Sequence, residues 1–208
     1  MDWKELLPDV IPYVSSPEER FKRPPDNLVL HYLRNAARTF LLESTLLRGK
    51  FCPDLQCGVR EVPLWLPEGR ELLRVHKVLP QEIAYSCGCQ AVAHRGSDAY
   101  EYDDGVLTLD WEPLEDMRRG VCITYSYLID VSDCEVPAEL TSQRWRAAIV
   151  DFALAELLGM PNMDWHDKAA SGFHLQKARH AAAKAKMHAS SQGGRKRVKL
   201  STAMERLF

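Results

Sequence analysis

The hydrophobic pattern of this 208-residue chain changes its period twice, and that switch limits the folds open to it. Apolar positions at the start lie three and four apart, as in helices, whereas the segment 51–134 has short alternating runs between turns, as in strands. Helical spacing returns after Pro137. Each helical region has an apolar face with little else to cover it, so the two regions must pack together. The sequence predicts an α+β fold with an antiparallel helical body of three main helices (1–50 and 135–190), a small antiparallel β-domain insertion (51–134) and an extended C-terminal tail (191–208).

Two of the helices are outlined by caps and apolar spacing. Asp26 stands where an N-cap would stand and Gly49 is a natural stop, so the first helix is expected at 27–48. The second follows Pro137 and is apolar nearly all round over 145–158. Such a helix is expected to be buried on more than one side.

The third helix is predicted from an alanine-rich run that extends through Ala185. Asp164 is the expected N-cap, with Asp167 near the positive end of the helix. Four histidines lie on or near this helix at spacings that do not form the i, i+4 pair of a metal site, and we expect them to face solvent: His166, His174, His180 and His188.

The β segment contains one strong turn signal. Asp103-Asp104-Gly105 separates two short apolar runs and predicts a hairpin between 100–102 and 106–109. Pro63 argues that its strand lies at a sheet edge or a bulge. The other expected strands, which suggest a small antiparallel sandwich or barrel, are 59–66, 70–79, 83–92 and 121–131.

Four cysteines in the β segment raise the question of zinc. Cys52 and Cys57 have four residues between them, and Cys87 and Cys89 have one. Zinc knuckles usually carry two residues between their thiols, so these spacings favour reduced cysteines that pack as small hydrophobic groups, with zinc as the alternative. No metal and no other cofactor is therefore expected, and Cys122 is expected in the core.

Motifs that carry catalysis or nucleotide binding are missing from the sequence. It contains no GxxxxGK[ST], GxGxxG or GxSxG, and its acid clusters fall on a predicted turn. The chain is therefore not expected to be an enzyme. No apolar run reaches the roughly 20 residues that span a bilayer, and the N-terminus does not resemble a secretory signal, so we expect a protein made in the cytosol that does not associate with membranes.

Charge is distributed unevenly along the chain. Residues 168–208 carry ten Lys and Arg against one acid, a net charge of +9, so the total of −2 leaves −11 on residues 1–167. A basic end on an acidic body indicates a segment that seeks an acidic surface. The tail combines cations with apolar anchors, which are Arg195, Lys196, Arg197, Lys199, Leu200, Met204, Leu207 and Phe208.

Three interpretations of this tail remain open. Cations with apolar anchors favour a segment that folds onto a protein partner. The cations alone suit binding to the phosphates of a nucleic acid, in which case the chain would be a nucleic-acid-binding module. The third interpretation is a solvated end with no ligand.

Three stretches, taken in order, resemble the head-to-tail adaptor (connector) proteins of tailed bacteriophages. They are LLPDVIPYV (6–14) followed by LRNAARTF (33–40); GVLTL (105–109) followed by VPAEL (136–140); and AAIVDFALAELLGMP (147–161) with Trp165, Lys168, Ala169, Ala170 and Phe173 behind it. Together they extend over most of residues 1–190.

The resemblance implies a virion structural protein of the neck, assembled in the host cytoplasm. It implies a homo-oligomeric ring, commonly a dodecamer, beneath the portal protein. The C-terminal segment would dock on the portal, and the opposite face would receive the tail tube, a nozzle or another neck protein. Genomic DNA would pass through the lumen without sequence-specific binding.

Overall fold

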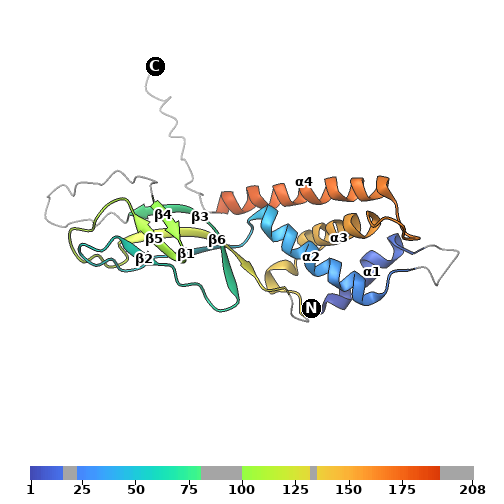
Figure 1. Cartoon of the computed structure of the whole chain (residues 1–208), viewed down its shortest axis with the longest axis horizontal. Coiled ribbons are helices and arrows are strands. Elements are labelled where there is room, and N and C mark those ends of the chain that lie inside the picture. Colours follow the sequence, from blue (N-terminus) through green and yellow to red (C-terminus); the bar gives the residue numbers. More distant parts are fainter. Residues whose placement is uncertain (16–22, 81–99, 132–134, 193–208) are drawn as a thin grey trace, which may run out of the picture.

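The protein is elongated, with its helices at one end and its strands at the other (Figure 1). A computed structural model describes residues 1–15, 23–80, 100–131 and 135–192. Within those ranges the fold is mixed α+β, with four α-helices and two three-stranded antiparallel sheets. The predicted strand at 83–92 lies outside the described residues.

The N-terminal residues form a set of short helical turns that are anchored in the core. These are η1 (Trp3–Leu6), α1 (Leu7–Val10) and η2 (Ile11–Tyr13). A capping box holds the first turn, because the Asp2 carboxylate accepts from the backbone N–H groups of the turn and the Glu5 carboxylate accepts from the Asp2 backbone N–H. Trp3, Leu6 and Val10 are buried, so these turns belong to the helical body.

Helix α2 (Asp26–Ser44) is shorter than its sequence predicts. It ends because Thr45 takes a left-handed conformation with φ of 45°, and the chain then enters strand β1 (Arg48–Phe51). The predicted stop at Gly49 is wrong, since Gly49 lies within β1. A glycine is needed there for another reason: a Cβ at this position would collide with the Tyr125 ring.

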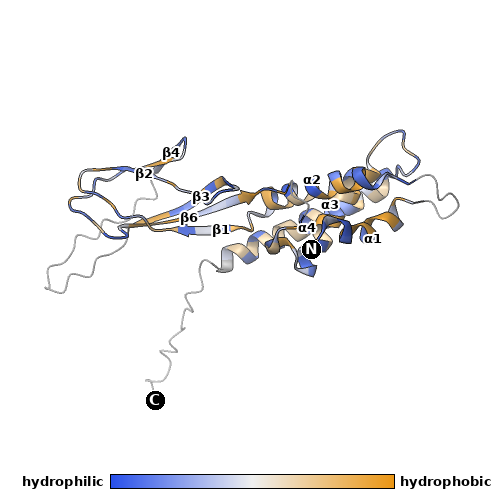
Figure 2. Ribbon diagram, turned by 90° about the horizontal axis from the view of Figure 1, so that it is seen from below, coloured by the Kyte–Doolittle hydropathy of each residue, from blue (hydrophilic) through white to orange (hydrophobic). Residues whose placement is uncertain are grey.

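Helix α3 (Gln143–Leu158) follows the short turn η3 (Ala138–Leu140) and is the central helix of the body. It packs against α2 and α4 (Lys168–Gln192), and side chains all round it are buried. The prediction of a helix buried on more than one side is confirmed. The bands of hydrophobic and hydrophilic residues along the helices are visible in Figure 2.

The larger sheet has the order β1-β6-β3, with β6 (Val121–Ile129) between β1 and β3 (Arg70–Pro80). Alternate residues of β6 are buried and apolar, which gives the sheet one core face: Val121, Ile123, Tyr125 and Tyr127. Strand β3 carries two register shifts, one between Leu72 and Arg74 and one between Val75 and Lys77.

The smaller sheet has the order β2-β5-β4 and contains the predicted hairpin. Strands β4 (Tyr100–Asp103) and β5 (Val106–Leu109) are joined through Asp104 and Gly105, whose φ values of 41° and 82° fit the tight turn. Strand β2 (Glu61–Pro63) lies at the edge of this sheet, as Pro63 predicts.

Candidate functional site: the outer face of helix α4

Helix α4 joins the described fold to the predicted tail, and its sequence gives it two different faces. Its first turn is capped by Asp167, whose carboxylate accepts from the backbone N–H groups of Ala169 and Ala170, both at 2.9 Å. The predicted cap, Asp164, is therefore wrong. The inner face is a stripe of small side chains, which lets α4 lie close to α2 and α3: Ala178, Ala182, Ala185 and Ala189.

The outer face of α4 is basic. No acid follows Asp167 along the helix, and the five exposed cations are Lys168, Lys177, Arg179, Lys184 and Lys186. Half of the ten cations of the basic C-terminal segment thus lie on a packed helix, and the other half lie in 193–208. The basic character that the sequence assigns to a tail begins on the folded body.

A buried carboxylate balances part of this charge from the inner side. Asp151 of α3 is 4% exposed, and its Oδ1 lies 2.9 Å from Nδ1 of His174. Lys177 Nζ donates to the same carboxylate at 3.0 Å. Because a buried carboxylate is costly without partners, this contact ties α4 to α3 at one place along its length.

His174 also shows where the sequence prediction fails. It is 8% exposed rather than solvent-facing, whereas His166, His180 and His188 are exposed as expected. The sequence signal that could have located His174 is Asp151, the one acid inside an otherwise apolar run at 147–155. A carboxylate that is buried in such a run needs a polar or charged partner.

Two exposed aromatic rings flank the buried histidine. Tyr13, from the end of η2, is 61% exposed and meets the His174 ring edge-on, with ring centroids 5.6 Å apart. Phe173 is 62% exposed and meets the same ring with centroids 5.5 Å apart. We call Tyr13 and Phe173 the aromatic patch.

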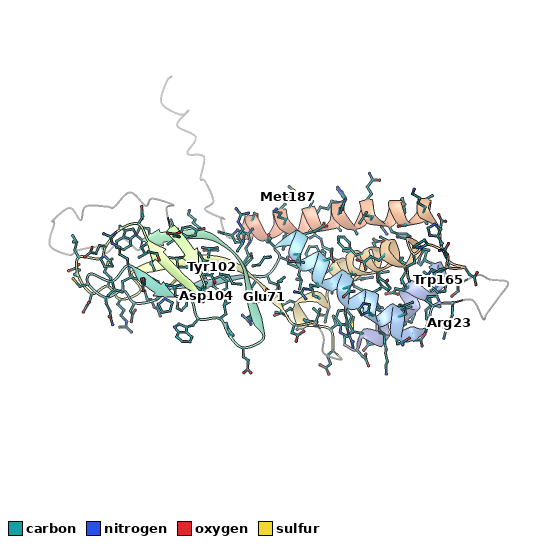
Figure 3. The ribbon with its side chains drawn as sticks, viewed as in Figure 1. Arg23, Glu71, Tyr102, Asp104, Trp165 and Met187 are labelled. Carbon is teal, nitrogen blue, oxygen red and sulfur yellow. The ribbon has the colours of Figure 1, made fainter. Side chains whose placement is uncertain are left out.

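Apolar side chains also reach the surface at both ends of α4, one of them exposed and the other half-buried. Met187, near its C-terminal end, is 72% exposed (Figure 3). Trp165 precedes the helix at the other end, where its indole N–H donates to the Leu157 carbonyl at 3.1 Å (Figure 3). The outer face of α4 therefore combines cations with apolar contacts, the composition expected of a protein-binding surface.

The predicted docking residues themselves lie outside the described residues. These are Arg195, Lys196, Arg197, Lys199, Leu200, Met204, Leu207 and Phe208. Their role stays a prediction. The structure places only the helix that leads to them.

The structure describes only part of the four-cysteine group that zinc would need. Cys52 and Cys57 are exposed, and Cys87 and Cys89 lie outside the described residues. Cys52 instead approaches Cys122: burial and a hydrogen bond with the Cys52 side chain raise the pKa of the Cys122 thiol. Within the described ranges, no group of three or more His, Cys, Asp or Glu side chains is placed to hold a metal ion.

Comparisons with known proteins assign no family. No protein-family model matches the sequence, and no curated protein matches it either. In the described part of the chain, no helix has both the length and the apolar character to cross a membrane.

Proposed function

We propose that the chain is a head-to-tail adaptor of a tailed bacteriophage, a structural protein that forms a ring beneath the portal and links it to the tail. The observation that supports this most is the order of elements. A β region lies between helices α2 and α3, and α4 then leads out of the body toward the basic tail. That order is the one the family resemblance implies, with an antiparallel helical body and a β insertion.

Ring formation is supported by the charge distribution. A ring uses two different patches of each copy, one meeting the other on its neighbour. The outer face of α4 is basic, whereas residues 1–167 carry a net charge of −11. Attraction between this basic surface and acidic residues of a neighbouring copy would favour the head-to-tail contact and disfavour contact between two basic surfaces.

The aromatic patch suits the centre of such an interface. Exposed aromatic rings lose little conformational entropy on binding and often contribute much of the affinity. Tyr13 and Phe173 come from different elements, yet both rest against His174, so their positions are fixed before assembly.

The docking claim is tested with the purified protein and its cognate portal. Deletion of residues 195–208 should abolish the complex, as measured by sedimentation and by native mass spectrometry. A matched variant that keeps every cation but changes Leu200, Met204, Leu207 and Phe208 to Ser separates the apolar anchors from charge. Full binding by the deletion variant would remove the tail from the proposal.

The ring is tested apart from the portal. Tyr13→Ser with Phe173→Ser should shift the mass from a ring toward a monomer, while Met163→Ser, an equally apolar change that is 40% exposed in the wild type, serves as control. A chain that stays monomeric at high concentration both alone and with its portal would contradict the adaptor role.

A second candidate function is a nucleic-acid-binding module that uses the basic C-terminal segment. The basic exposed surface of α4 favours it, since five exposed cations project from one helix, although Lys177 and Arg179 are paired with Asp151 and Glu43. Binding to DNA would then weaken steeply with salt, because each neutralised phosphate releases counterions. An absence of binding at low salt would dismiss this candidate.

A further inference from the structure

A second group of basic side chains lies where the C-terminal end of α4 meets the larger sheet. Arg48 of β1 donates from Nη2 to Ser190 Oγ of α4 at 3.1 Å. Arg48 and Arg74 are both in register with Ser126, one on each side of it, so the three side chains lie on the same face of the sheet. His76 occupies the register shift of β3 that follows Val75. Arg48, Arg74, His76 and Lys186 form what we call the junction cluster.

No acid balances the junction cluster within the described part of the chain. Burial lowers the pKa of His76 most, and the charges of Arg48, Arg74 and Lys186 lower it further. Burial also lowers the pKa of Arg48. The nearest acid along β3, Glu71, is instead 3.9 Å from Arg38 of α2.

Among the residues that the structure describes, two buried nitrogen atoms of the junction cluster have no hydrogen-bond partner. They are Nε of Arg48 and Nε2 of His76. Buried polar atoms in folded proteins nearly always have a partner, so two of them within one basic cluster indicate a ligand that supplies acceptors. The ligand must be an anion, because it has to offset positive charge as well as accept hydrogen bonds.

The cations continue along the same sheet face. Lys50 and Lys77 are both in register with Thr124, which repeats the arrangement of Arg48, Ser126 and Arg74 one step along the strands. The two rows are separated by two residues on β1 and β6, or roughly 7 Å of strand, and by three on β3 because of its register shift. Each row places a hydroxyl residue between two cations, and the second row is open to solvent, with Lys50 and Lys77 exposed.

We propose that this face, from the junction cluster to Lys50 and Lys77, binds the phosphate backbone of a nucleic acid. Arginine forks and hydroxyl groups are the side chains that recognise phosphate oxygens. A single small anion would occupy only the junction cluster. A chain of phosphates would also reach Lys50 and Lys77, which extend the positive charge outward over the sheet. The site uses only described residues, and it rests neither on the adaptor role nor on the tail.

The test measures binding of the full-length protein to a fluorescent 20-base-pair DNA duplex by anisotropy over a series of salt concentrations. Lys50→Gln with Lys77→Gln changes two exposed side chains and should leave the fold intact. We expect affinity at low salt to fall about tenfold or more and the salt slope to decrease by about one for each lost contact. Lys186→Gln should reduce affinity in the same way.

Matched controls separate this site from general charge. Lys168 lies at the opposite end of α4, about 27 Å from Lys186 by helical rise. Lys168→Gln and Arg118→Gln, the latter an exposed β-region cation, remove the same charge and should change affinity less than twofold. DNA binding that survives the Lys50, Lys77 and Lys186 changes, or that falls equally in the controls, would overturn the proposal and leave the tail as the DNA-binding segment.

Competing ligands identify the chemistry. Inorganic phosphate should displace the duplex only at high concentration and should shift the side-chain NMR signals of Arg48 Nε and His76 Nε2. Poly-glutamate tests a protein ligand instead. If poly-glutamate binds as tightly as DNA and depends on the same lysines, the ligand is an acidic protein surface and the nucleic-acid proposal fails.

Discussion

Helix α4 takes part in two groups of basic side chains along its length, and the fold treats them differently. Toward its N-terminal half, His174 and Lys177 share the buried carboxylate of Asp151. At its C-terminal end, Lys186 joins Arg48, Arg74 and His76 with no acid among them. The first group has an acid partner inside the fold, whereas two buried nitrogen atoms of the second have no hydrogen-bond partner in the described part of the chain.

The difference separates a structural role from a binding role. A buried charge that has its partner within the chain fixes how two helices pack, and losing the partner costs stability. A group of like charges lowers stability until an outside anion arrives, so its presence is explained by what it binds. The following predictions test that division, from the largest expected effect to the smallest.

The largest effect is expected at Asp151. Asp151→Asn keeps the shape of the side chain but leaves His174 and Lys177 without an anion. We expect the free energy of unfolding to fall by about 2 kcal/mol, below the usual range for a fully buried pair because Lys177 is half exposed. Urea unfolding followed by circular dichroism measures it. Asp9→Asn, which breaks the more exposed pair with Arg146, is the control and should cost less than about 1 kcal/mol.

Adding an acid to the junction cluster should have the opposite sign. Ser190→Asp places a carboxylate beside Arg48 and should raise the free energy of unfolding by about 0.5–1 kcal/mol, even though an acid near a helix C-terminus is slightly unfavourable. Ser190→Asp should no longer raise the free energy of unfolding in a protein that also carries Arg48→Gln. A double-mutant cycle of the two substitutions measures this. A loss of stability on adding the acid would mean that the cluster is already balanced.

The junction cluster should also make stability depend on pH. The pKa of His76 is lowered in the fold, so the unfolded chain binds the proton more readily. Above a pH of about 6.5, the pKa of His76 in the unfolded chain, His76 is neutral in both states and does not lower the free energy of unfolding. As the pH falls below that value, the unfolded chain takes up the proton first, so the free energy of unfolding decreases. Thermal melts between pH 7.5 and 5 should show a larger decrease for the wild type than for His76→Gln. Equal slopes would contradict the lowered pKa.

The smallest effect concerns Glu156, a partly buried acid of α3. Burial raises its pKa, and His31 opposes this only in part. Its charged form is thus disfavoured in the fold at neutral pH, and Glu156→Gln should stabilise the protein by less than about 0.5 kcal/mol. The gain should shrink as the pH falls toward about 4, where the carboxyl is mostly protonated in both states. Chemical denaturation at pH 7 and pH 4 checks the sign.

Local features of the fold could be predicted from the sequence, and features set by distant contacts could not. The Asp104-Gly105 turn follows from two residues that accept positive φ. The end of α2 does not, because Gly49 fits a helix stop equally well and only pairing with β6 makes Arg48–Phe51 a strand. The junction cluster joins β1, β3 and α4, so no window of the sequence contains it.

The two register shifts in β3 have a consequence for solubility. In the order β1-β6-β3 this long strand has a neighbour on one side only among the described residues. A straight edge of that length would offer backbone groups to any extended chain, including another copy of the protein. Each bulge bends the strand and interrupts its regular spacing of donors and acceptors. Copies gathered at high local concentration are thereby discouraged from joining edge to edge into fibrils.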